Sequence, residues 1–131
     1  MVSDTIGDLI IRLKNAGAVK KDTVEVPFSK LRHAVLEKLV ATGFVTAVEV
    51  IGESPKQTLV VTLHYKEGGF HAIGGVKRIS KPGRRIYKKV TEIYPVKFGH
   101  GKAIMSTPAG ILTGEEAREK QVGGEQLFLI W

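Results

Sequence analysis

The chain has 131 residues, of which 43% are apolar, and a net charge of +7 with no cysteine. This length and composition predict one packed domain, or two small lobes that share a core, and exclude disorder, disulfides and thiolate chemistry. The N-terminus lacks an export signal and no run reaches the roughly 18 apolar residues of a membrane span, so we expect a soluble, cytoplasmic protein with no membrane partner.

A helix is the first predicted element, over residues 3–17. Its apolar residues recur at helical spacing, with Ser3 or Asp4 as the N-cap. Asn15 or Gly17 is the predicted stop. The result is an amphipathic helix with one apolar side.

A strand and a second helix follow. Residues 23–28 alternate between apolar and polar, and Pro27 indicates an edge strand or a strand end. Residues 29–43 predict a helix with Ser29 as its N-cap and Gly43 at its stop. The predicted apolar face of this helix consists of Leu31, Val35, Leu36 and Leu39.

Two runs rich in β-branched residues complete the first half. Residues 44–51 and 58–65 are predicted strands, and the sequence GESPKQ between them suits a hairpin loop. The order of elements is therefore α-β-α-β-β, with two helices covering one face of a small sheet. We assign residues 1–69 to this N-terminal lobe.

The second half, residues 70–131, is predicted to be mostly β. Two short strands flank a tight turn at Pro82 and Gly83, residues 91–101 form a connection, and residues 102–107 and 126–131 are further strands. The predicted fold class is α+β, with residues 70–131 as a mostly β C-terminal lobe.

A short helix is predicted between the last two strands. Thr113 and Glu116 form a T-x-x-E capping box, Glu115 opposes the positive end of the helix dipole, and Gly123 is placed to close the helix. An isolated helix of about eight residues is marginal in water. We therefore expect this helix to fix loop positions more than to supply core area.

Basic residues gather in the second half. Residues 1–69 carry nine Lys and Arg against eight Asp and Glu, whereas residues 70–131 carry eleven against five. Such a basic stretch is typical of a nucleic-acid binder, because neutralising phosphates releases counterions. The alternative is a solvated basic face that aids solubility. Between residues 70 and 114, where Glu92 is the single acid, the basic residues are Lys77, Arg78, Lys81, Arg84, Arg85, Lys88, Lys89, Lys97 and Lys102.

The sequence contains no complete motif for a metal site, a phosphate-binding loop or a nucleophilic serine. The four histidines are scattered without a metal-binding motif, although His64 and His71 flank a turn and are placed to meet. The sequence GHGKA at 99–103 lacks the spacing of a phosphate loop, and Ser106 lacks a nucleophile motif. We predict that the chain is not an enzyme and uses no metal or cofactor.

Small polar residues cluster at the start of the stretch 105–125. The hydroxyls of Ser106 and Thr107, stiffened by Pro108, form a compact patch that can donate and accept hydrogen bonds. Exposed backbone at Gly123 and Gly124 would allow a ligand to approach closely. Such a surface suits splayed bases and 2′-hydroxyls of folded RNA. The alternative is an ordinary connector between a strand and a helix.

The same stretch resembles a known family. The sequence STPAGILTGEEAREKQVGGEQLFLIW is similar to the C-terminal signature of the eighth protein of the small ribosomal subunit, a universal family, in its bacterial type. SDTIGDLIIRLKNA, VPFSKL and RISKPGRRIYKK resemble its N-terminal helix, its first strand-to-helix junction and its basic hairpin. The resemblance covers essentially the whole chain in order.

The resemblance implies a constituent of the small subunit that binds the central domain of its ribosomal RNA directly and helps to assemble the platform. It implies contacts with neighbouring ribosomal proteins, a monomer outside the ribosome and, in some bacteria, repression of the protein's own messenger RNA. Residues carried over as RNA contacts are Ser29, Lys30, Lys56, Arg85, Tyr87, Ser106, Thr107, Gly124 and Glu125; from charge we add Lys77, Arg78, Arg84, Lys88 and Lys89 as phosphate contacts.

Several alternatives stay open. Tyr87 either stacks on the RNA or packs across strands, and Trp131 either fills a gap in the C-terminal lobe or meets a neighbouring protein. Pro108 stands where relatives commonly have a third hydroxyl. The rival functions are a module that docks an acidic protein partner and a small DNA-binding protein, although no basic recognition helix is evident.

Overall fold

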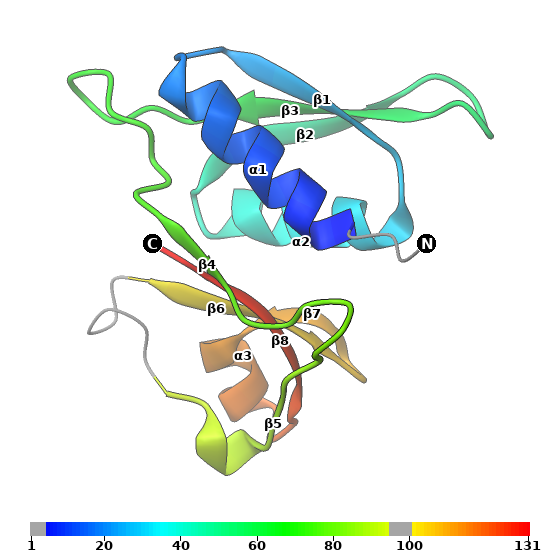
Figure 1. Ribbon diagram of the computed structural model, residues 1–131, viewed down its shortest axis with the longest axis vertical. Coiled ribbons are helices and arrows are strands. Elements are labelled where there is room, and N and C mark those ends of the chain that lie inside the picture. The colour runs from blue at the N-terminus through cyan, green and yellow to red at the C-terminus, as the bar shows by residue number, and fades with distance from the viewer. Residues whose placement is uncertain (1–4, 95–100) are drawn as a thin grey trace. The chain divides into compact units, whose positions relative to one another are not determined.

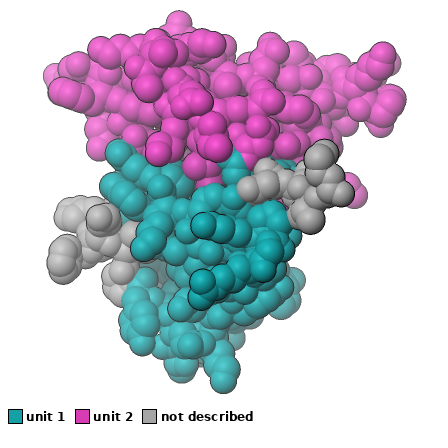
Figure 2. All heavy atoms as spheres, viewed as in Figure 1, with its two compact units in different colours: residues 1–7, 74–131 teal, residues 8–73 magenta. Residues whose placement is uncertain are grey.

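The structure is a computed structural model that describes residues 5–94 and 101–131 (Figure 1). It confirms the predicted α+β class, with three α-helices and two antiparallel sheets in the described residues. The chain divides into two compact units, residues 8–73 and residues 1–7 with 74–131, which Figure 2 distinguishes by colour. We describe each unit by itself. The division into an N-terminal lobe of residues 1–69 and an RNA-binding C-terminal lobe of residues 70–131 remains a proposal.

The predicted N-caps Ser3 and Asp4, and the part of the predicted connection that covers residues 95–100, lie outside the described residues. None of the helices within the described ranges is both long and apolar enough to cross a membrane.

The first five elements follow the predicted order. A three-stranded antiparallel sheet has the strand order β1-β3-β2, so that β1 is an edge strand and Pro27 is its last residue, as predicted. Helices and strands have these bounds: α1 Thr5–Ala18, β1 Thr23–Pro27, α2 Lys30–Ala41, β2 Val45–Ile51 and β3 Thr58–Leu63.

Only one side of strand β3 is fully buried, and the helices cover that face of the sheet. The residues of β3 alternate between half-buried and buried, and Leu59, Val61 and Leu63 form the buried side. Helices α1 and α2 lie over that side (Figure 1). In α2 the buried face begins at Val35, because Leu31, which we predicted to belong to it, lies in the first turn and is 37% exposed.

Helix α1 runs past both of its predicted stops to Ala18. Gly17 serves a packing role, since a Cβ at this position would overlap the His71 imidazole. The helix ends at Ala18. Beyond this end, Lys20 takes a positive φ of 57°, and Lys21 N–H donates to the Ala16 carbonyl at 3.0 Å. Because residue 17 has no side chain, the imidazole ring of His71, which is 54 residues further along the chain, fits against the helix.

The remaining elements form a second antiparallel sheet with the order β4-β8-β6-β7, in which β5 also pairs with β8. Strand β7 was not predicted: it pairs with β6 across the two-residue turn of Pro108 and Ala109. The bounds are β4 Val76–Arg78, β5 Tyr87–Lys88, the 3-10 helix η1 Val90–Glu92, β6 Lys102–Thr107, β7 Gly110–Thr113, α3 Gly114–Glu119 and β8 Gly124–Ile130.

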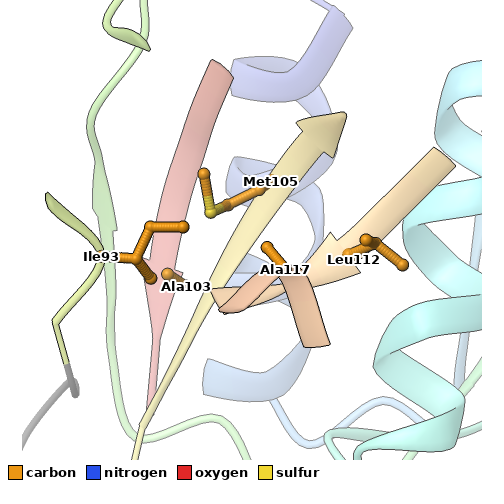
Figure 3. Packing of buried hydrophobic residues seen from close by; sticks show 5 residues of the cluster. All are labelled: Ile93, Ala103, Met105, Leu112 and Ala117. Atoms are coloured by element: carbon orange, nitrogen blue, oxygen red, sulfur yellow. The ribbon is translucent and has the colours of Figure 1, made fainter. Parts of the chain in front are cut away.

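A small apolar cluster lies beneath α3. It consists of Ile93, Ala103, Met105, Leu112 and Ala117, which are labelled in Figure 3. Met105 and Ala117 are fully buried. Helix α3 therefore contributes to the core through one small side chain, in addition to fixing the loops at its ends.

The predicted capping box of α3 is confirmed. Thr113 Oγ1 accepts from Glu116 N–H at 3.2 Å, and Glu116 Oε1 accepts from Thr113 N–H at 3.0 Å. The end of the helix differs from the prediction that Gly123 closes it: the C-cap is Lys120, and Gln121 takes the left-handed conformation with φ 58°.

The predicted basic hairpin is only half correct. The tight turn exists, with Lys81 and Arg84 exchanging backbone hydrogen bonds of 3.0 and 2.9 Å. The two strands beside it do not pair with each other, because β4 and β5 both pair with β8. They are consecutive pieces of one edge strand, and the turn lies in a loop between them.

Candidate nucleic-acid interface

Three strands bring predicted site residues into one row across the second sheet. Tyr87 of β5 is the Cα partner of Glu125 in β8, and Glu125 is the partner of Ser106 in β6. Ile111 of β7 continues the row beyond Ser106. Partners in antiparallel strands carry their side chains on the same face, and Met105, the neighbour of Ser106, points into the apolar cluster on the other face. Tyr87, Glu125 and Ser106 therefore share the face that points away from this cluster.

The two hydroxyls of the predicted patch differ in what they bind. Thr107 Oγ1 donates to the Gly110 carbonyl at 2.8 Å and accepts from Ala109 N–H at 3.1 Å, so it holds the turn between β6 and β7. No group in residues 5–94 or 101–131 makes a hydrogen bond with the Ser106 hydroxyl. Ser106 is half-buried and keeps its full capacity to donate and accept.

The double glycine has a packing role within the sheet. Both residues are half-buried, and a Cβ at Gly124 would overlap the Ser106 carbonyl oxygen. A Cβ at Gly123 would lie 2.5 Å from the Lys88 carbonyl oxygen. The chain's own strands occupy the space of both Cβ positions, because β8 begins between β5 and β6. An approach of RNA to the backbone of Gly124 stays a prediction.

An ion pair explains the acidic residue in this basic region. Arg85 Nη1 lies 3.2 Å from Glu125 Oε2, and the side chains of Arg85 and Glu125 are 50% and 15% exposed. The arginine therefore balances the carboxylate where it would otherwise repel phosphates. Tyr87, the strand partner of Glu125, is 69% exposed, so cross-strand packing leaves most of its ring open.

The other predicted phosphate contacts lie on the edge strands β4 and β5 and in the tight turn between them. Lys77 on β4 and Arg84 in the tight turn are exposed, and Lys88 is half-buried opposite Gly124. Arg78 is half-buried, and its Nη2 donates to the Ser80 carbonyl at 2.8 Å. Part of its hydrogen-bonding capacity therefore supports the loop that follows.

Sequence reasoning missed Ser80. This residue is buried, and its hydroxyl bonds to backbone groups of Ile86 and Gln126. The available signal was a serine directly before a Pro-Gly turn, a position where hydroxyls often bond to nearby backbone groups.

Three predicted contacts belong to the unit of residues 8–73. Ser29 Oγ accepts from Arg32 N–H at 3.0 Å, so this hydroxyl caps α2 as predicted. Lys30, the first residue of α2, is exposed. Lys56 is exposed in the loop between β2 and β3, where it lines a shallow groove together with Arg12.

Two arginines that sequence reasoning did not single out converge in the same unit. Arg12 Nε and Arg32 Nη2 lie 3.0 and 3.7 Å from the same Asp8 carboxylate oxygen. Each guanidinium also donates to a carbonyl of β1, at Glu25 for Arg12 and at Pro27 for Arg32. They tie the two helices to the edge strand.

The described residues offer no grouping for metal chemistry: within 5–94 and 101–131 no three His, Asp or Glu side chains gather as a metal site requires. His71 Nδ1 lies 3.4 Å from the His64 carbonyl oxygen, and its ring packs beside Tyr65. Burial, followed by the nearby Asp22 carboxylate, raises the pKa of Tyr65. His100 and Lys97 lie outside the described ranges.

Comparison with known proteins gives one consistent family. The model of the family described as Ribosomal protein S8 matches residues 4–131. The chain is similar to the small ribosomal subunit protein uS8 of Dictyoglomus thermophilum, with 46% identity over 99% of this chain and 98% of the relative. It is also similar to the uS8 protein of Bdellovibrio bacteriovorus, with 41% identity over 98% of this chain and 99% of the relative.

Proposed function

Because this chain belongs to the ribosomal protein S8 family, and is therefore a structural constituent of the small ribosomal subunit and not an enzyme, we propose that it binds the central domain of small-subunit ribosomal RNA directly. The binding helps to assemble the platform of the subunit. The second sheet supplies the main contact, through the row of Tyr87, Glu125 and Ser106 and the basic residues of β4, β5 and the tight turn.

The observation that carries this proposal is the Ser106 hydroxyl. It has no partner among the described residues, and it shares a face with the exposed Tyr87 ring. A short hydroxyl loses little rotamer freedom on binding and can donate to or accept from base edges and 2′-hydroxyls. Such a group discriminates between RNA sites in a way that a flexible lysine does not.

The cations of β4, β5 and the tight turn position the RNA but do not distinguish one RNA sequence from another. Lys77, Arg84 and Lys88 contact phosphates, which gives affinity that depends on salt. Tyr87 offers an open ring face for stacking, worth about 1–3 kcal/mol per base in single-stranded sites. Glu125, balanced by Arg85, accepts from base amino groups or from a ribose hydroxyl.

The unit of residues 8–73 adds a second contact. Lys30 and Lys56 are exposed and reach phosphates, whereas Ser29 contributes by capping α2. This pattern suits a protein that touches a folded RNA at two places. The proposal includes neighbouring small-subunit proteins as partners, a cytoplasmic location, a monomeric state outside the ribosome and repression of the chain's own messenger RNA.

Binding to two RNAs across a salt series tests the proposal. The purified chain is titrated with a central-domain fragment and with an unrelated duplex of equal length. We expect binding to the fragment to persist at salt concentrations that abolish binding to the duplex, because base and sugar contacts do not release counterions. Equal loss of both complexes would leave only a basic surface and would refute specific recognition.

A further inference from the structure

The buried hydroxyl of Ser80 joins the two ends of a short basic loop. We call residues 81–85, KPGRR, the basic loop. Ser80 is 3% exposed, and its Oγ accepts from Ile86 N–H at 3.0 Å and donates to the Gln126 carbonyl at 2.8 Å. One oxygen atom therefore links the residue before the loop, the residue after it and strand β8.

The backbone on both sides of the basic loop is hydrogen-bonded to the same short part of β8. The N–H groups of Ile79 and Ser80 both donate to the Leu127 carbonyl at 3.2 Å, and Gln126 N–H donates to the Ile86 carbonyl at 2.9 Å. Leu127 and Gln126 are consecutive in β8. The basic loop is thus an insertion into an edge strand, and Ser80 closes its base.

The basic loop contains three cationic side chains. Lys81, Arg84 and Arg85 are exposed, and Arg85 reaches Glu125, the residue that precedes Gln126 in β8. The direction in which the loop leaves the sheet therefore decides whether Arg85 lies beside Glu125 and Tyr87.

We propose that Ser80 is a positioning residue for RNA recognition, whose hydroxyl fixes the basic loop so that Arg85 is held beside the row of Tyr87, Glu125 and Ser106. The inference rests on the proposed function, because it assigns the loop a part in RNA binding. A hydroxyl suits the position because it accepts from one chain segment and donates to another. Alanine at this position leaves the Ile86 N–H without its acceptor and the Gln126 carbonyl without its donor.

Loss of the hydroxyl should affect specificity more than affinity in general. The charges of the loop remain when it moves, so the attraction to any phosphate backbone persists. The fixed placement of Arg85 is lost, and with it the match to one particular RNA surface.

The test compares Ser80→Ala with Thr113→Ala in the full-length chain. Thr113 is a matched control, because it is also a buried hydroxyl, 4% exposed, that accepts from a backbone N–H in the same unit but lies outside the loop. Amide exchange of Ile86 and Gln126 is measured in the free proteins. Binding is measured to the central-domain fragment and to the unrelated duplex. If Ser80→Ala does not fold, Ser80→Cys, whose thiol is a weak hydrogen-bonding group, is used in the same comparison.

We expect Ser80→Ala to speed exchange at Ile86 and Gln126 by about tenfold relative to Thr113→Ala, and to lower the preference for the fragment by about tenfold with duplex binding unchanged. A Ser80 variant that keeps the exchange rates or the RNA preference of the control would overturn the inference. A wild-type chain that prefers neither RNA would instead refute the proposed function, and that outcome is seen without any variant.

Discussion

Gly124 lies directly against the backbone of Ser106. A Cβ at position 124 would overlap the Ser106 carbonyl oxygen and lie 3.0 Å from Thr107 Cα. The end of β6 and the start of β8 can therefore pair as they do only if residue 124 lacks a side chain. The glycine thereby allows Ser106 and Glu125 to become partners.

Replacing Gly124 with alanine should therefore destabilise the fold. The new methyl group meets backbone, which cannot rotate away as a side chain can, and overpacking of this kind costs about 1–3 kcal/mol. Urea unfolding measures the change. Gly83→Ala is the matched control, because nothing lies within 4 Å of a Cβ there. Its stability should stay within about 0.5 kcal/mol of wild type. Equal stability of both variants would refute the close approach.

Ser106 and Thr107 should respond differently to alanine. Ser106→Ala removes a hydroxyl without a partner in the described residues, so stability should change by less than about 0.5 kcal/mol while RNA binding weakens by about 1–3 kcal/mol. Thr107→Ala breaks two hydrogen bonds in the turn and should lower stability by about 0.5–1.5 kcal/mol. Unfolding and RNA titrations on each variant separate the two roles. If Thr107→Ala left stability unchanged, the turn assignment would fail.

Arg85→Ala should change the salt dependence of RNA binding. If Arg85 contacts a phosphate in the complex, the slope of log K against log salt should become shallower by about one. Ser106→Ala makes no change in charge and should keep the wild-type slope. The Arg85–Glu125 pair is half exposed on its cationic side, so its loss should cost the free protein at most about 1 kcal/mol. Parallel slopes for wild type and Arg85→Ala would remove this residue from the phosphate contacts.

Gly17 and His71 should be coupled in the unit of residues 8–73. Glycine to alanine normally stabilises a helix by up to about 1 kcal/mol. Here the new Cβ would overlap the His71 ring, so Gly17→Ala should destabilise the protein by about 1–3 kcal/mol. In a His71→Ala background the same change should become stabilising. Thermal unfolding of the four proteins completes the cycle, and an unchanged sign would contradict the packing of His71 on Gly17.

The sequence predicted elements best where many residues repeat one pattern. Helices α1 and α2 and strand β3 each bury a regular apolar side, and their positions agree with the prediction within a few residues. Strand β7 escaped prediction because it is four residues long and runs straight from a turn into the cap of α3. The pairing of β4 and β5 with β8 was beyond local reasoning, since a nearby turn favours a hairpin and only long-range contacts decide otherwise.

The candidate site was predicted in its residues but not in its arrangement. The pattern of small hydroxyls indicated Ser106, and the family resemblance indicated Tyr87, Ser106 and Glu125, which lie far apart in the sequence. Their row follows from the register of three strands, which no local pattern contains. Ser80 was missed, because its bond to the Gln126 carbonyl crosses 46 residues of sequence and no local pattern contains it.

The most direct test of the account is the ratio of two dissociation constants, for an unrelated duplex and for a central-domain RNA fragment, measured for wild type and Ser106→Ala at one salt concentration. We predict that wild type prefers the fragment by about a thousandfold or more, and that Ser106→Ala loses at least about tenfold of this preference without weaker binding to the duplex. An unchanged ratio in a stably folded Ser106→Ala protein would contradict the claim that this face of the second sheet reads the RNA.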